Sequence, residues 1–253
     1  MSTELAERDF DSARDAVDGV KGWMSTDQAR RLWDAASRLR APARIVEIGS
    51  FHGRSTIVLR RAAEPGVEVV AIDPHGGGDR GPQEITPDAV RGDEDYRSFH
   101  ANLERAGVDS DVRHLRLKSS EALSELEGPV DLLYIDGAHR YAPALDDIQR
   151  WGARVAPGGT MLIHDTYNAV GVMLAQLRVL FLSREWRYVG RSRSLAEYRR
   201  EPRADGALAQ NVARQAAGVP WFVRNCAIKV AMVARQPQLA RRMGLPEGDA
   251  WPY

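Results

Sequence analysis

The sequence has 253 residues, 43% apolar and 28% charged, which is enough to build a large hydrophobic core. Acidic and basic residues balance at 35 each, so no overall field attracts nucleic acid, and we predict no nucleic-acid partner. The single cysteine excludes an intramolecular disulfide and a cysteine-rich zinc site, which fits a reducing compartment. The N-terminus lacks the apolar segment of a secretory signal, and no apolar run approaches the roughly 20 residues that span a bilayer. We therefore expect no transmembrane segment and a cytoplasmic location.

The composition divides the chain into three predicted parts. Residues 1–40 are a helical lead-in, in which Ser25 and Gln28 of STDQ form a capping box before an amphipathic helix. Residues 41–204 form the main domain. Residues 205–253 are predicted to be a C-terminal helical extension.

Within the main domain, short β-rich apolar runs alternate with helical stretches. The predicted strands cover residues 44–49, 67–73, 112–118, 130–136, 160–165, 186–191 and 194–200. This alternation is typical of a parallel sheet covered by helices, and the tiny turn between the last two runs predicts an antiparallel hairpin. The predicted fold class is therefore α/β, with a Rossmann-like, seven-stranded, mostly parallel sheet, a closing antiparallel hairpin, and helices on both faces.

Three connecting segments complete this prediction. Residues 74–95 are rich in glycine and proline, are unlikely to be regular, and are long enough to cover a site as a lid. A single helix is expected over residues 142–155, followed by a PGG turn at 157–159 that precedes the fifth strand.

The turn after the first predicted strand has the features of a ligand site. Ligands of open parallel sheets bind beyond the carboxyl ends of the strands, and VEIGSFHGRST places Glu47, Gly49 and Gly53 there. Glycines let a ligand approach the backbone, and the following helix N-terminus offers free amide groups. The turn lacks the G-x-G-x-x-G spacing of a dinucleotide site. Asp73 ends the second strand, where an acid can accept hydrogen bonds from ribose hydroxyls.

A second polar group follows the fourth and fifth strands. If these strands are neighbours about 4.8 Å apart, Asp136 and Asp165 can meet at one ion, and their oxygen ligands suit Mg²⁺. His139 can face the same pocket as a general base. An isolated Asp–His pair would more simply cap a turn, but the second acid reverses that preference. Alternation along the strand points His164 away from the ion, so the third ligand stays open between His164, Thr166 and water.

Other polar residues have simpler interpretations. Asp146 and Asp147 lie within a predicted helix near Arg150, so a solvated, ion-paired helix face accounts for them. The loop residues that could also touch the acceptor or a cofactor carboxylate are His52, Arg54, His75 and Asp79.

Over roughly residues 40–200 the sequence resembles the class I S-adenosylmethionine-dependent methyltransferases. The matching motifs occur in order: EIGSFHG, AIDP, KSSEAL, LLYIDGAH and APGGTMLIHD. Within this class, DGAHRY and the later HD look most like the metal-dependent sugar and natural-product O-methyltransferases, which implies Asp136 as a Mg²⁺ ligand and His139 as the base. The cofactor contacts implied by the resemblance are Glu47, Gly49 and Gly53 at the methionine part of S-adenosylmethionine, Asp73 at the ribose, and Ser119 and Ser120 at the adenine side. Ser120 could equally be only a helix N-cap.

The resemblance predicts an O-methyltransferase that transfers a methyl group from S-adenosylmethionine to a hydroxyl. The polarity of residues 74–95 favours a saccharide acceptor over a flat catechol. Two alternatives stay open, an NAD-dependent dehydrogenase on a similar sheet and a cofactor-binding protein without catalysis. Trp221, Phe222 and Trp251 need cover, which predicts a homodimer, although packing within one chain would serve as well.

Overall fold

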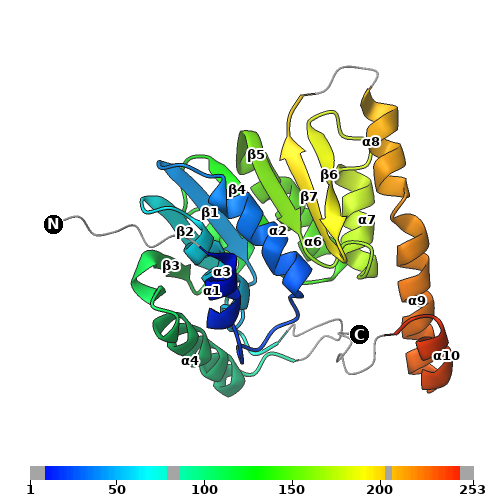
Figure 1. Cartoon of the computed structure of the whole chain (residues 1–253), viewed down its shortest axis with the longest axis horizontal. Helices are drawn as coiled ribbons and strands as arrows, with labels where there is room; N and C mark the ends of the chain where they lie inside the picture. Colours follow the sequence, from blue (N-terminus) through cyan, green and yellow to red (C-terminus); the bar gives the residue numbers. More distant parts are fainter. Residues whose placement is uncertain (1–8, 79–85, 203–206, 246–253) are drawn as a thin grey trace.

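The computed structural model describes residues 9–78, 86–202 and 207–245, and its centre is a seven-stranded sheet (Figure 1). The strand order is β3-β2-β1-β4-β5-β7-β6. The strands are β1 (Ala43–Ile48), β2 (Val67–Ile72), β3 (Val112–Leu115), β4 (Val130–Ile135), β5 (Val155–Ile163), β6 (Trp186–Ser192) and β7 (Leu195–Arg200). The first five are parallel, and β7 pairs antiparallel with β5 and β6. The predicted fold class and the closing hairpin are confirmed.

Helices cover both faces of the sheet because the strands bury alternate side chains on opposite sides. On β1, Ile45 belongs to one buried cluster, whereas Val46 and Ile48 belong to the other. The first cluster packs against α1 (Phe10–Ala16), α2 (Thr26–Ser37), α3 (Arg54–Ala62) and α4 (Ala89–Arg105). The second packs against α5 (Ser119–Ala122), α6 (Tyr141–Asp146) and α7 (Val170–Val179). The sheet is therefore the middle of three layers.

Within the lead-in, α2 begins at the predicted capping box. From residue 9 onward, where the structure describes it, the lead-in contains two helices, α1 and α2, and not one continuous helix. Ser25 N donates to Gln28 Oε1 at 2.8 Å and Gln28 N donates to Ser25 Oγ at 3.4 Å, so the capping box is confirmed. Between α1 and α2 the chain is irregular over residues 17–25. This irregular segment reaches the carboxyl ends of the strands, where it borders the cavity described below.

Two local predictions around β5 are wrong. The expected PGG turn at 157–159 lies inside β5 as an irregularity, because the β4–β5 register shifts between Val130 and Leu132 and Gly158 takes a φ of 80°. The expected helix over 142–155 is broken after α6 into a π-helical segment, η2 (Asp147–Trp151), and a 3₁₀ turn, η3 (Gly152–Arg154). Another 3₁₀ turn, η1 (Asp109–Asp111), precedes β3.

The C-terminal region is helical, as expected, over its described residues. It contains α8 (Ala207–Ala216), α9 (Val219–Val233) and α10 (Pro237–Arg242), which run along the β6 side of the molecule (Figure 1). Trp221 and Phe222 pack within the chain against a small cluster that includes Tyr167 and Phe181. Trp251 lies outside the described residues. Over the described ranges, no helix combines the length and apolarity needed to cross a membrane.

Gly49 allows the ends of β1 and β4 to approach each other, and substitution tests this contact. Its φ is 87°, and an added Cβ would lie 2.2 Å from the carbonyl oxygen of Asp136. We expect Gly49→Ala to lower the free energy of unfolding by about 3 kcal/mol or more in urea denaturation, because strain adds to overpacking. Gly107→Ala is the control, since Gly107 has a φ of 68° with open space around it. Equal losses for the two variants would contradict the close approach as the cause.

Candidate active site

A cavity of about 930 Å³ lies at the carboxyl ends of β1, β2 and β4, a size suited to a small-molecule cofactor and its co-substrate. Its lining comes mainly from five parts of the chain: the segment before α2, the turn after β1, the turn after β2, the start of α5, and the loop after β4. This is the end of the sheet at which open α/β folds bind ligands. The order of the strands reverses at β1, because β2 lies on one side of it and β4 on the other, and this switch point opens the space.

The first turn places only one of its three predicted residues at the cavity. Gly49 lines it. Glu47 lies behind it, fully buried, and its carboxylate accepts hydrogen bonds from the hydroxyls of Ser55 and Thr56. Burial raises the pKa of Glu47 to about 7, although the two hydroxyl donors oppose this shift. Gly53 starts α3 with a φ of 84°, and an added Cβ would lie 2.4 Å from Leu103, so Gly53 serves the packing of α3 on α4.

Asp73 ties the first two turns together at the cavity wall. Its Oδ2 accepts a hydrogen bond from the amide of Phe51 at 2.8 Å, and its Oδ1 accepts one from the amide of His75 at 2.8 Å. The carboxylate therefore has a defined orientation at the edge of the cavity. Ser119 and Ser120 line the cavity at the start of α5.

Asp147 differs from its predicted place on a solvated helix face. Asp146 is half-buried and pairs with Arg150 at 3.3 Å, as expected, although it also borders the cavity. Asp147, however, is 3% exposed and lines the cavity, because the π-helical segment η2 begins there. Burial raises the pKa of Asp147 to about 6, against a hydrogen bond from Ser119. The sequence pattern carried no sign of this widened turn.

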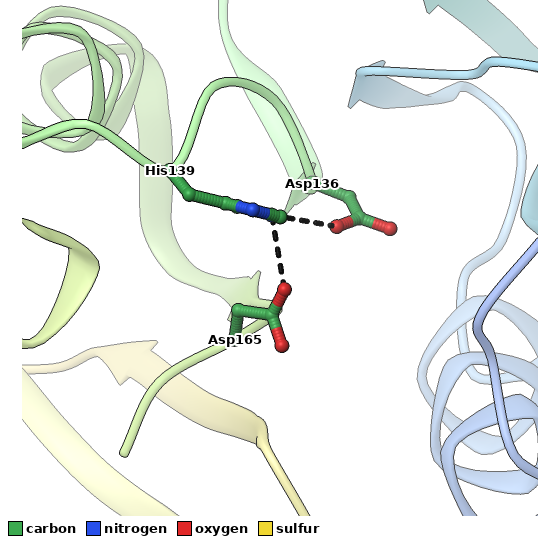
Figure 2. A group of neighbouring side chains, drawn as sticks. All are labelled: Asp136, His139 and Asp165. Atoms are coloured by element: carbon green, nitrogen blue, oxygen red, sulfur yellow. Dashed lines mark ion pairs between the residues drawn. The ribbon is translucent and has the colours of Figure 1, made fainter. Parts of the chain in front are cut away.

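The predicted acceptor residues meet at one point (Figure 2). Asp136 follows β4, Asp165 follows the adjacent β5, and backbone bonds hold the strand ends, with the amide of Asp136 donating to the Ile48 carbonyl at 2.8 Å. His139 Nε2 lies 3.0 Å from Asp165 Oδ2 and 4.0 Å from Asp136 Oδ1. One ligand atom from each of these three residues lies within 4.8 Å of the others, a spacing that could hold a metal ion. Tyr134 donates its hydroxyl to Asp136 Oδ2 at 2.9 Å.

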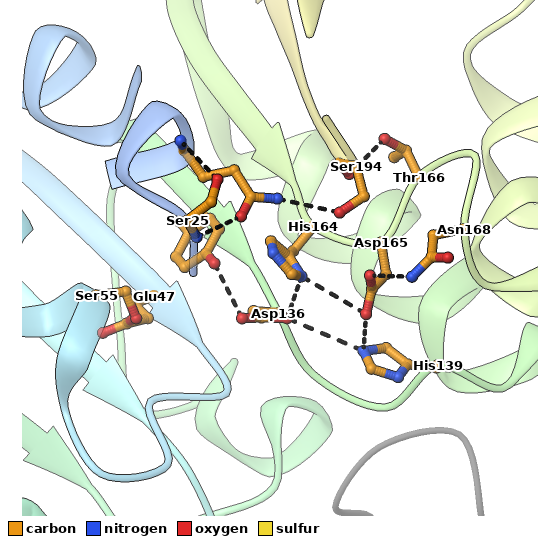
Figure 3. Close-up of polar contacts among 12 residues, drawn as sticks. Ser25, Glu47, Ser55, Asp136, His139, His164, Asp165, Thr166, Asn168 and Ser194 are labelled. Atoms are coloured by element: carbon orange, nitrogen blue, oxygen red, sulfur yellow. Dashed lines mark hydrogen bonds and ion pairs between the residues drawn. The ribbon is translucent and has the colours of Figure 1, made fainter. Parts of the chain in front are cut away.

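His164 points toward the acids, which corrects the prediction that it turns away (Figure 3). Its Nδ1 lies 3.1 Å from Asp136 Oδ1 and 3.6 Å from Asp165 Oδ2. The predicted alternation fails because β5 ends at Ile163 and Asp165 adopts a left-handed φ of 54°. Thr166, the other open candidate for a third ligand, donates its hydroxyl to the Ser194 carbonyl at 2.8 Å instead.

The four charged groups at this point shift one another's pKa values. Burial opposes the charging of His139, but hydrogen bonds to Asp136 and Asp165 and their charges raise its pKa to about 9. Burial also opposes the charging of His164, and the same two carboxylates raise its pKa well above its usual range. The two carboxylates therefore favour the cationic form of both histidines. In return, and against the effect of burial, the histidines lower the pKa values of Asp136 and Asp165.

Sequence reasoning missed the contribution of the lead-in to the cavity. Lys21, Trp23 and Met24 line it, and Trp23 is 43% exposed. The Trp23 ring stacks on Phe51 with centroids 5.7 Å apart and an interplanar angle of 21°. The contact joins residues 28 positions apart in the sequence, and no local sequence pattern predicts it.

The remaining loop candidates have structural partners. His52 Nε2 lies 2.8 Å from Asp95 Oδ1, and Arg54, which borders the cavity, donates to the Val20 carbonyl at 2.9 Å. His75 is buried, although part of it borders the cavity. Asp79 lies outside the described residues.

Comparison with known proteins finds similarity to methyltransferases. A family model described as a methyltransferase domain matches residues 46–166. The chain is 29% identical over 210 residues to catechol O-methyltransferase of Mycobacterium tuberculosis, covering 81% of each chain. Residues 46–166 therefore resemble a methyltransferase domain, and they contribute most of the residues that line the cavity.

Two further comparisons concern the extent of the similarity and the fold of this chain. It is 32% identical over 129 residues to an uncharacterised protein of Sinorhizobium fredii, a match to 49% of this chain and only 13% of that protein. Its fold is similar to that of cofactor-bound Rv0187 from Mycobacterium tuberculosis, with a TM-score of 0.53 and 22% identity over 78% of this chain and 93% of that one.

The buried Glu47 makes the stability of the protein depend on pH. Because its pKa is raised from 4.5 to about 7 in the folded state, its neutral form stabilises the fold at low pH, and this contribution is lost as pH rises from 4.5 through 7. We expect the loss to be about 3 kcal/mol, at about 1.4 kcal/mol per pKa unit.

Glu47→Gln should remove that slope in denaturation curves measured from pH 4.5 to 8. The exposed Glu125 offers a matched control, since Glu125→Gln should leave the slope as in the parent protein. An unchanged slope in Glu47→Gln would contradict the assignment.

Proposed function

We propose that this protein transfers a methyl group from S-adenosylmethionine to a hydroxyl of a small polyhydroxylated acceptor, with Mg²⁺ held by Asp136 and Asp165 and with His139 as the general base. The observation that carries the proposal is the meeting of these three side chains beside the cavity. Methyl transfer from a sulfonium is an in-line displacement, so the acceptor oxygen is the group that needs activation.

The donor set fits a divalent cation. Two carboxylates from adjacent strand ends supply hard oxygen ligands, which suit Mg²⁺ when water and substrate oxygens complete the shell. Asp165 is buried and Tyr134 orients Asp136 through its hydroxyl, so both ligands are held before a cation arrives. A bound Mg²⁺ would lower the pKa of a coordinated hydroxyl.

The base role of His139 depends on the same cation site. A histidine with a pKa of about 9 is protonated at neutral pH and cannot accept the acceptor's proton. The two carboxylates are what raises this pKa, and a cation bound between them would offset their charge. His139 Nε2 then becomes able to take the hydroxyl proton.

The proposed cofactor contacts lie just beyond the ends of strands and at the start of α5. We propose that the backbone at Gly49 receives the methionine part of S-adenosylmethionine, that Asp73 accepts from the ribose, and that Ser119 and Ser120 border the adenine. Glu47 and Gly53 contribute from outside the cavity lining, by holding the first turn and the start of α3.

The acceptor class has two candidates that share adjacent hydroxyls. The polarity of residues 74–95 favours a saccharide. A catechol is the second candidate, favoured by the stacked Trp23 and Phe51 at the cavity wall, since an aromatic face suits a flat ring. One of the relatives reported above is a catechol O-methyltransferase, which supports the second candidate.

A screen with labelled S-adenosylmethionine against sugars and catechols tests the function. We expect product with one class only, loss of product on chelation, and recovery on adding Mg²⁺. Calorimetry should show binding of S-adenosylmethionine and none of NAD. Turnover that withstands chelation would refute the metal, and tight NAD binding without S-adenosylmethionine binding would refute the whole assignment.

His139→Ala tests the base. We expect turnover to fall by about 10²- to 10⁴-fold, the usual contribution of a general base, while S-adenosylmethionine binding stays near its original value. His100→Ala is a matched control, because His100 forms a similar pair with Asp109 at 2.7 Å outside the cavity lining. Similar turnover in both variants would contradict the role of His139.

We also propose that the protein is a homodimer that covers the outer face of α9. Val223, Val230 and Val233 are 59%, 67% and 86% exposed on one side of this helix. Val230→Glu should convert a dimer to a monomer in sedimentation experiments, while Val90→Glu, at a site 69% exposed on α4, should not. A monomeric parent protein would refute this proposal.

A further inference from the structure

The turn that carries Asp165 has an unusual backbone. After β5 ends, residues 164–168 form a turn in which Asp165 and Tyr167 adopt left-handed φ values of 54° and 57°. Side chains other than glycine rarely adopt this conformation, and it persists only where surrounding contacts enforce it. At Asp165, which faces the proposed acceptor site, specific contacts must therefore enforce the left-handed conformation.

Helix α9 supplies two of these contacts from the C-terminal region. Asn225, fully buried, donates through Nδ2 to the Tyr167 carbonyl at 3.2 Å. Lys229 donates through Nζ to the Asn168 carbonyl at 2.8 Å. Both carbonyls belong to the turn, so α9 holds the backbone of the turn through two hydrogen bonds.

The turn passes this constraint to the Asp165 carboxylate. Asn168 Nδ2 donates to Asp165 Oδ1 at 2.9 Å, as Figure 3 shows, which leaves Oδ2 directed at His139. The amide of Ala169 donates to the Asp165 carbonyl at 2.9 Å. A shift of Asn168 would therefore rotate the carboxylate away from His139 and Asp136.

The side chain of Tyr167 also anchors the turn. The side chain is fully buried, and its hydroxyl donates to the Gln215 carbonyl at 2.9 Å. Gly218, between α8 and α9, lies so close that an added Cβ would be 2.6 Å from the ring. The junction of α8 and α9 is thus shaped around Tyr167.

We propose that Asn225 and Lys229 are positioning residues for methyl transfer, which hold the left-handed turn so that Asp165 faces Asp136 and His139. The proposed extension 205–253 then has a role in the site, although none of its described residues lines the cavity. The consequence for metal binding rests on the proposed function. The constraint on the turn does not.

Lys229→Met is the main test, because it keeps the length and apolar stem of the side chain and removes only the donor. Lys229→Arg restores a cationic donor. Arg224→Met is the matched control on the same helix, since Arg224 donates to the carbonyls of Met243 and Gly244 and, at 3.4 Å, to Asn225 Oδ1, but not to the turn or to the Asn225 Nδ2 that holds it. Asn225→Ala is a second variant, and thermal denaturation reports whether it folds.

Two measurements on the full chain separate the turn from the metal. Hydrogen exchange of the Ala169 amide, without metal, reports the turn, and we expect Lys229→Met to accelerate it about tenfold while Arg224→Met leaves it unchanged. Binding of Mn²⁺, followed by electron paramagnetic resonance, should weaken about tenfold in Lys229→Met and recover partly in Lys229→Arg. Binding of S-adenosylhomocysteine should stay the same, which a general loss of structure would not allow.

The outcomes are distinct. Unchanged exchange in Lys229→Met overturns the proposal whatever the metal does. So does accelerated exchange with a Mn²⁺ affinity equal to that of Arg224→Met. If the parent protein binds no Mn²⁺ but Lys229→Met still accelerates exchange, the positioning of the turn stands and the proposed metal function fails.

Discussion

Two carboxylates of like charge, Asp136 and Asp165, converge at the ends of adjacent strands, and much of the surrounding structure compensates for that. Such a pair is unfavourable unless cations or hydrogen-bond donors stand beside it. Here His139 and His164 supply positive charge from two sides, and Tyr134 supplies a hydroxyl. A divalent cation would be attracted by the same two carboxylates.

Residues farther from the two carboxylates hold them in place. Asn168 fixes one oxygen of Asp165, and α9 fixes the backbone around Asn168. On the other side, Gly49 lets the Asp136 carbonyl approach β1, and Asp73 joins the turns after β1 and β2. The turns after β1 and β2 are thus connected to the Asp136–Asp165 pair through the end of β4.

The sequence predicted the sheet, the hairpin and the approach of Asp136, His139 and Asp165, because strand ends in parallel sheets collect at one edge. It failed where the backbone leaves the regular repeat. Asp147 became buried through a π-helical turn, and His164 turned inward because β5 ended one residue before it. Glu47 and Gly53 occur in the predicted turn, but the Glu47 carboxylate and the Gly53 backbone serve the fold behind the cavity.

The sequence by itself determined the order of elements and the chemistry available at each strand end, since periodicity and turn residues are local properties. Only the tertiary structure decided how the lead-in, with Trp23, joins the cavity wall and how α9 reaches the turn of Asp165. These contacts join segments far apart in the chain. Their energies depend on close packing and hydrogen-bond geometry, which no short sequence pattern encodes.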